Sequence, residues 1–222
     1  MTKIYPINLR FANAYLIATQ DGLTLVDAGM PGDEKQIIHQ IQSLGDNNLK
    51  LIFITHAHLE HYGSAAALKR ITGAQIAIHE YDVDSMANGS TELGETKGRG
   101  RLTKMILSIM LPLVPVEGLQ ADIVIKDQDE LQAYGLNASA IHTPGHTAGS
   151  SSLFLNNRHI FVGDLVSTNG SPHIQRYYAN DWSQIPKSLS RIGTLQPELI
   201  YPGHGRNSLT RLEFSKLLAK CI

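Results

Sequence analysis

The sequence predicts an α/β fold in which two β-sheets pack together and helices cover their outer faces. Short apolar strand patterns alternate with helical patterns along the 222 residues, and the two halves of the chain have a similar make-up. Hydrophobic residues form 42% of the sequence, which is enough for a core and argues against a disordered chain. We therefore expect one domain, residues 1–222.

The first half contains a series of strand patterns and two helical ones. Pro31 and Asp33 suit the start of the first helix, and Gly45 suits its end. Ser64 is a suitable N-cap for the second helix. The expected strands are 3–10, 13–18, 23–27, 49–55 and 74–80, and the expected helices are 31–45 and 65–72.

The second half continues the alternation. Its strands are again short and rich in β-branched or aromatic residues, and glycine-containing turns separate them. The expected strands are 122–125, 137–143, 151–155, 158–164 and 198–203, and the expected helices are 181–195 and 208–220.

Residues 87–119 interrupt this rhythm. The segment begins polar and glycine-rich, and then becomes apolar on nearly every face over 102–111, until Pro112 and Pro115 stop the helix. One interpretation is a buried helix or a homodimer contact. The other is a helical lid or insertion over an active site, whose apolar side chains would hold an apolar part of a substrate. The sequence leaves both open.

Composition narrows the classes of partner. The net charge is −1, from 19 basic and 20 acidic residues, so there is no electrostatic case for nucleic acid. The single cysteine, Cys221, cannot form an internal disulfide, which fits a reducing compartment. The N-terminus has no apolar core of a signal peptide, and no stretch reaches the ~20 apolar residues of a membrane span. We expect a cytoplasmic protein with a small-molecule substrate and no membrane partner.

The stretch "THAHLEH", residues 55–61, carries the strongest chemical signal. His56 and His58 are two residues apart just after a strand, so a turning loop can aim both at one ion. Glu60 and His61 follow where the chain has curled further, and they can face a neighbouring point. This spacing indicates two metal ions a few ångströms apart that share a bridging water.

Three later residues strengthen the metal interpretation. His146, Asp164 and His204 each follow a strand pattern and lie in a glycine-rich turn. Asp164 ends an apolar strand, where a buried carboxylate without a cation would be costly. Packing alone does not explain the same placement three times.

The motifs HxHxxH, PGHT, GD and PGHG, in this order, resemble those of the metallo-β-lactamase fold superfamily, from "LTLVDAG" to the last histidine loop. The resemblance implies an αββα sandwich of two mixed β-sheets flanked by helices, with a metal site along one edge. It also implies a ligand set: His56, His58 and His146 for the first metal, His61 and His204 for the second, and Asp164 bridging both. Asp27 would support the site through a ligand rather than bind metal, and we expect a similar supporting role for His142.

Glu60 departs from the family pattern HxHxDH, in which an aspartate binds the second metal and holds the nucleophilic water. Metal–ligand distances tolerate errors of only roughly 0.2 Å, and glutamate is one methylene longer. The loop could shift and keep both ions, the second ion could bind weakly, or Glu60 could leave the ion and act only on the water. We favour a weakened second site, with Glu60 and Asp164 as the catalytic carboxylates.

The resemblance predicts a metal-dependent hydrolase that uses a metal-bound hydroxide on the carbonyl of a lactone, ester or thioester, with two Zn²⁺ per chain. A mononuclear iron sulfur dioxygenase-like oxidoreductase and a catalytically weak metal-binding protein are the alternatives, and iron or manganese are the alternative metals. Among the carbonyl substrates, lactonase or esterase activity ranks ahead of thioesterase activity, because 102–111 suits an acyl chain and no helical domain follows His204. His173, Tyr177 and Tyr178, in the loop after Asp164, are the candidate substrate-binding residues.

Overall fold

The computed structural model describes residues 2–45, 48–98 and 100–220, so Cys221 lies outside the described residues. The first sheet has the strand order β1-β2-β3-β4-β5-β7. Strands β1 to β3 pair antiparallel, whereas β3, β4, β5 and β7 pair parallel, so the sheet is mixed. Its strands are β1 (Lys3–Asn8), β2 (Asn13–Ala18), β3 (Leu23–Val26), β4 (Leu49–Phe53), β5 (Gln75–His79) and β7 (Ile123–Ile125).

The second sheet has the order β15-β14-β10-β9-β8 and is also mixed, because β10 and β14 pair parallel while the other pairs are antiparallel. Its strands are β8 (Ala138–His142), β9 (Ser151–Leu155), β10 (His159–Phe161), β14 (Leu199–Tyr201) and β15 (Leu209–Thr210). Two short ribbons, which the sequence did not reveal, pair β11 (Val166–Ser167) with β12 (His173–Ile174), and β6 (Glu95–Thr96) with β13 (Tyr178–Ala179).

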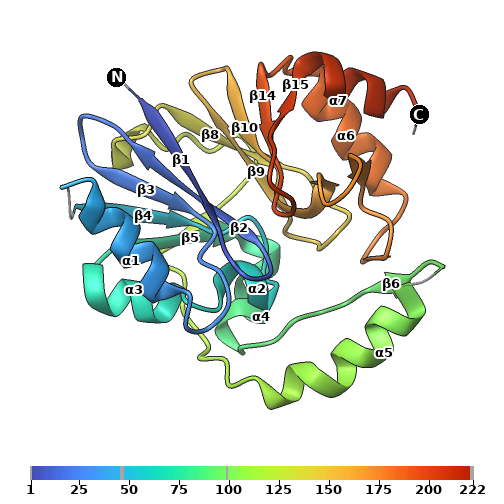
Figure 1. The fold of residues 1–222 in the computed structure, drawn as a ribbon, viewed down its shortest axis with the longest axis horizontal. Coiled ribbons are helices and arrows are strands. Elements are labelled where there is room, and N and C mark those ends of the chain that lie inside the picture. Colours follow the sequence, from blue (N-terminus) through green and yellow to red (C-terminus); the bar gives the residue numbers. More distant parts are fainter. Residues whose placement is uncertain (1, 46–47, 99, 221–222) are drawn as a thin grey trace.

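Helices cover the outer face of each sheet (Figure 1). Helices α1 (Glu34–Ser43) and α3 (Ala65–Thr72) pack on the first sheet, and α6 (Gln184–Thr194) and α7 (Arg211–Leu218) pack on the second. The buried apolar residues accordingly form one cluster between the two sheets and one under each helical layer. On β4, Phe53 faces the other sheet and Ile52 faces the helices, as the period of two in a strand requires. The predicted αββα sandwich is confirmed.

The predicted N-cap position of Ser64 is confirmed. Ser64 occupies the N-cap position of α3, but its hydroxyl makes no cap hydrogen bond there. It accepts instead from the backbone N–H of Glu34, the first residue of α1. Ser64 therefore satisfies an unpaired donor of the neighbouring helix, which spacing along the chain could not reveal.

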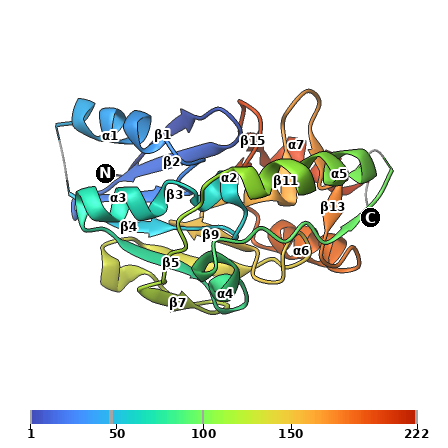
Figure 2. The same ribbon diagram turned by 90° about the horizontal axis from the view of Figure 1, so that it is seen from below.

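The segment 87–119 forms α5 (Gly100–Met110), which lies below the two sheets in Figure 1 and, seen from below in Figure 2, in front of the body. It is tied to the body by the β6–β13 ribbon and by the Leu59 backbone N–H, which donates to Thr91 Oγ1. Leu102 is 58% exposed and Ile109 is 66% exposed, so the interpretation as a buried helix is wrong. No helix of the described chain is long and apolar enough to cross a bilayer.

Candidate metal centre

The loops that follow β4, β8, β10 and β14 meet at one edge of the sandwich, and they bring all seven predicted metal-binding side chains together. In each of two groups, one potential ligand atom per residue lies within 4.8 Å of the others. The first group is His56, His58 and His146, and the second is Glu60, His61, Asp164 and His204. These are the two sets that the resemblance implies, with Glu60 in the position of the family's aspartate.

The first group is buried, with no member more than 1% exposed. His146 Nε2 lies 2.9 Å from His58 Nδ1, and the ring centroid of His56 lies 4.6 Å from that of His58 and 4.7 Å from that of His146. His56 Nε2 is fully buried and has no hydrogen-bond partner among the residues that the structure describes. A buried polar atom without a partner is costly, whereas converging neutral imidazole nitrogens are ligands that a divalent transition metal prefers. The donor set therefore fits a metal ion.

Asp164 lies between the two groups. Its Oδ1 is 3.2 Å from His61 Nε2, and its Oδ2 is 3.1 Å from His204 Nε2 and 3.4 Å from His146 Nε2. The carboxylate follows β10 in a short 3-10 turn, Gly163–Leu165, in which Gly163 adopts a φ of 50°. A Cβ on Gly163 would lie 2.7 Å from Thr55 Oγ1, so the close approach of this turn to the histidine loop requires glycine.

Each histidine of the two groups has an outer partner on its other ring nitrogen. Such partners fix the tautomer and orientation of a metal-binding imidazole. The contacts are His56 Nδ1 to Thr55 Oγ1 (3.1 Å), His58 Nε2 to Glu92 O (2.8 Å), His61 Nδ1 to Asp27 Oδ2 (2.8 Å), His146 Nδ1 to the acceptor Tyr178 O (3.4 Å), with the amide Nε2 of Gln175 also 2.8 Å away, and His204 Nδ1 to Phe11 O (2.8 Å). Every ring thus presents one nitrogen to its group and the other to the surrounding protein.

Asp27 occupies the supporting position that the resemblance implies. Besides His61, its carboxylate accepts from the Thr55 backbone N–H at 2.8 Å and from the Thr55 hydroxyl at 3.0 Å. Sequence reasoning missed the other outer partners. Glu92 and Phe11 act through backbone carbonyls, which carry no residue-type signal, and Gln175 lies in a loop whose path depends on the β11–β12 ribbon.

Burial and neighbouring charge set the protonation of the centre. Burial, together with the nearby histidines, holds the pKa of His56 well below its usual value, and burial lowers the pKa of His146 to about 3. Burial alone would lower the pKa of His61 as well, but Asp27 and Asp164 outweigh it and raise that pKa well above its usual value. His56 and His146 are therefore neutral at pH 7 and able to bind a cation, while His61 must release a proton to do so.

Glu60 lies in the first turn of the short helix α2 (Leu59–Tyr62) and is only partly buried. Its longer side chain still reaches the second group. Within the described part of the chain, no hydrogen bond holds its carboxylate, in contrast to Asp27 and Asp164. A weakened second metal site remains a prediction.

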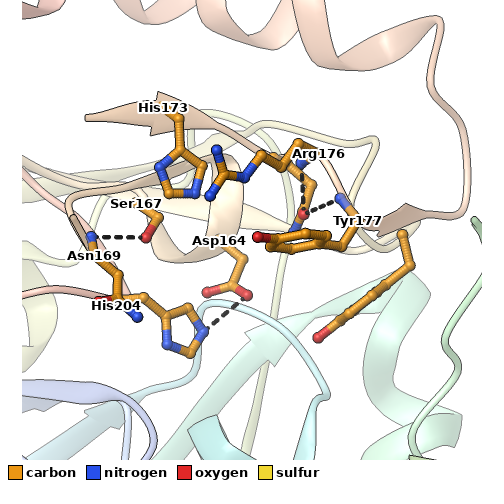
Figure 3. A pocket seen from close by; sticks show the side chains of 9 residues that line it. Asp164, Ser167, Asn169, His173, Arg176, Tyr177 and His204 are labelled. Atoms are coloured by element: carbon orange, nitrogen blue, oxygen red, sulfur yellow. Dashed lines mark hydrogen bonds and ion pairs between the residues drawn. The ribbon is translucent and has the colours of Figure 1, made fainter. Parts of the chain in front are cut away.

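A cavity of about 230 Å³ opens beside the second group (Figure 3). Asp164 and His204 form part of its lining, and all three predicted substrate-binding residues, His173, Tyr177 and Tyr178, line it as well. The remaining lining residues are Ser167, Asn169, Gln175 and Arg176, which sequence reasoning missed. No described residue of α5 lines this cavity.

His142 is not brought to the ligand groups. Its ring stacks on that of His79 with centroids 4.1 Å apart and 12° between the planes, and its Nε2 lies 2.8 Å from Ala148 O. The ring of His142 therefore contacts the loop that carries His146 at a backbone carbonyl, that of Ala148.

Comparisons with known proteins agree with this geometry. A family model described as metallo-beta-lactamase superfamily matches residues 7–204. A beta-lactamase-like protein 2 homolog of Drosophila melanogaster is 26% identical over 205 residues, which cover 90% of this chain and 60% of that protein. An uncharacterized protein of Bacillus subtilis is 33% identical over 210 residues, 87% of this chain and 83% of its own length. A hydroxyacylglutathione hydrolase of Haemophilus influenzae is 26% identical over 212 residues, 91% of this chain and 90% of its own.

The fold is also similar to solved structures. A metallo-beta-lactamase family protein of Thermus thermophilus superimposes with a TM-score of 0.74 at 18% identity, covering 99% of this chain and 79% of that one. At that identity the likeness concerns the fold alone.

Proposed function

The chain belongs to the metallo-beta-lactamase superfamily, and from this premise we propose that it hydrolyses a small carbonyl substrate, a thioester, ester or lactone, at a two-metal centre. The observation that carries the proposal is the convergence of seven nitrogen and oxygen ligands in two adjoining groups, with a cavity beside the second. Relatives named metallo-hydrolases and hydroxyacylglutathione hydrolases support hydrolysis as the reaction class.

We expect zinc at both positions, with iron or manganese as alternatives. His56, His58 and His146 would hold one ion, Glu60, His61 and His204 the other, and Asp164 would contact both. When bound, such ions lower the pKa of a coordinated water toward ~7 and polarise a carbonyl oxygen. A deprotonated His61 keeps its remaining proton on Nδ1, where Asp27 accepts it.

The protein's own groups would orient the reactants. No hydrogen bond from the described residues engages the carboxylate of Glu60, so it can accept one from the attacking water. The ring of Tyr178 lies 5.8 Å from that of His58 and 5.4 Å from that of His146. Burial, with the charges of Glu60 and Asp164, raises the pKa of Tyr178 well above its usual value. Its phenol therefore keeps its proton at neutral pH and can donate it in a hydrogen bond to a substrate oxygen.

Among the carbonyl substrates, a thioester ranks first. The relatives named hydroxyacylglutathione hydrolases favour it. The sequence argument for a lactone or ester relied in part on an apolar α5 in contact with the substrate, whereas the cavity is lined by residues between 164 and 178 and by His204.

The test is a set of lactones, esters and thioesters with the same acyl chain, assayed after metal removal and reloading with zinc, manganese or iron. We expect thioester hydrolysis that a chelator abolishes and zinc restores. Protein that contains two metal equivalents and hydrolyses none of these substrates would contradict the proposal. A preparation with iron near one equivalent that oxidises a persulfide would establish the sulfur dioxygenase alternative.

A further inference from the structure

Asp82 is a buried carboxylate that none of the metal motifs contains. It ends the 3-10 turn Glu80–Asp82 after β5 and is only 3% exposed. Its Oδ2 accepts from the Ala57 backbone N–H and from Thr147 Oγ1, each at 2.8 Å, and its Oδ1 accepts from the Gly149 backbone N–H at 2.8 Å. A buried carboxylate needs such donors, because desolvation without them would be costly.

The partners of Asp82 adjoin the ligands of the first group. Ala57 lies between His56 and His58, and Thr147 directly follows His146. We infer that Asp82 is a positioning residue for the first metal: it joins the loop that carries two of the ligands to the loop that carries the third. Its hydrogen bonds go to backbone groups and to a hydroxyl, so it acts on the ligands through the spacing of their loops.

In this junction, the hydrogen-bond network of Asp82, Thr147 and Ser150, the donor and acceptor of each hydrogen bond can be assigned. An ionised carboxylate can only accept, so the Thr147 hydroxyl donates its single proton to Asp82. Thr147 Oγ1 must then accept from the Ser150 hydroxyl, 2.8 Å away, while Ser150 Oγ accepts from the Thr147 backbone N–H at 2.9 Å. Because every donor has one acceptor, the junction holds the loops in one arrangement.

The backbone of the His146 loop approaches Asp82 closely. A Cβ on Gly149 would lie 2.6 Å from the Asp82 carboxyl carbon. Only glycine allows the Gly149 N–H to reach Oδ1 without displacing the carboxylate.

Asp27 and Asp82 hold the backbone N–H groups of the two residues next to His56, one on each side. Asp27 accepts from the N–H of Thr55, and Asp82 accepts from the N–H of Ala57. Asp27 also contacts His61 of the second group, whereas the hydrogen bonds that the described residues give Asp82 come from Ala57, Thr147 and Gly149, beside ligands of the first group. Loss of Asp82 should therefore weaken the first metal selectively.

The inference rests on the proposed metal centre, and its readout is metal affinity. The metal-free protein is titrated with zinc against a chromophoric chelator. In Asp82→Asn the amide NH₂ must face a backbone N–H or the Thr147 hydroxyl, so we expect the dissociation constant of the first site to rise about 10–100-fold, as for other outer partners. Thr147→Val removes one of the three hydrogen bonds and should raise the same constant several-fold.

Two single variants, each lacking one metal site, show which site Asp82→Asn weakens. In His204→Ala, which retains the first group, Asp82→Asn should weaken the remaining ion. In His58→Ala, which retains the second group, it should leave zinc binding unchanged. The matched control is Asp122→Asn: Asp122 also accepts a backbone N–H, that of Ile76 at 2.8 Å, but it lies away from the ligand loops and should not alter affinity.

Unchanged zinc affinity in Asp82→Asn, or equal weakening in both backgrounds, would overturn the inference. If Asp82→Asn does not fold, Thr147→Val decides: an unchanged first-site constant overturns the inference, and a raised one supports it. Wild-type protein that binds no zinc would instead contradict the proposed function.

Discussion

The two ligand groups lie side by side, yet the protein holds them differently. Every histidine of the first group is buried, and each has an outer partner. In the second group, His61 and Asp164 are equally buried, but the His204 side chain is 25% exposed and no hydrogen bond in the described chain fixes Glu60. The first group is therefore enclosed and rigidly held, as retention of an ion requires, whereas the second group faces the cavity.

The largest expected difference comes from removing one histidine on each side. His58→Ala takes away a buried ligand and should lower first-site affinity by more than the roughly 10–100-fold typical of losing an outer partner. It also leaves a buried void beside His146 and should lower the unfolding temperature. His204→Ala removes a partly exposed ring and should cost only the second ion. Elemental analysis and thermal unfolding of both variants check this. Equal losses of metal and stability would contradict the conclusion that the two groups are held differently.

Glu60→Asp should strengthen the second group instead of weakening it. Because the shorter acid restores the family's ligand, we expect tighter binding of the second zinc and hydrolysis faster by at least about tenfold, which corresponds to 1.4 kcal/mol of barrier. Glu60→Gln, which has the same length without the charge, is the control and should weaken the second ion. No change in either zinc stoichiometry or rate in Glu60→Asp would show that Glu60 already serves as an adequate ligand.

His79 belongs to neither ligand group, but its titration should make the stability of the protein depend on pH. This effect must be separated from that of the ligand groups. Burial and then the stacked His142 lower the pKa of His79 to about 4, against about 6.5 in the unfolded chain. The unfolded state therefore binds more protons between these values, so this contribution to stability is present at pH 7 and is lost as the pH falls.

His79→Gln tests this effect, because glutamine does not titrate. Urea unfolding at pH 7 and pH 5 should show a smaller loss of stability on acidification in the variant than in the wild type. Identical losses would mean that His79 is not the responsible group and that the acid sensitivity belongs to the metal ligands.

The smallest effect on stability is expected in α5. Leu102→Ser and Ile109→Ser change exposed side chains, so the free energy of unfolding should stay within about 0.5 kcal/mol of the wild type. The double variant separates the two interpretations of segment 87–119 that remain. A shift from dimer to monomer in size-exclusion chromatography would identify a dimer contact, whereas a raised KM for long-acyl substrates alone would identify a lid.

The sequence predicted the main strands and helices because their apolar periods are strong. It predicted which side chains converge because histidine and aspartate at strand ends are chemically conspicuous. It could not predict the exposure of α5, since an apolar pattern is the same whether or not another surface covers it. It also missed Asp82, whose role depends on two loops, around 57 and 147–149, that meet only in three dimensions. Outer partners that act through main-chain carbonyls have no signature at all.

The hydrogen bond between His58 Nε2 and the carbonyl of Glu92 has a consequence beyond ligand orientation. Glu92 lies at the start of the segment that carries α5, so His58 belongs both to the first ligand group and to the attachment of that segment. Because coupling between two sites is reciprocal, binding to α5 or displacement of α5 changes the affinity of the first group for an ion. Binding of an ion in turn changes the stability of the contact that holds the segment. Amide exchange at 90–98 should accordingly be slower in zinc-loaded protein than in chelated protein.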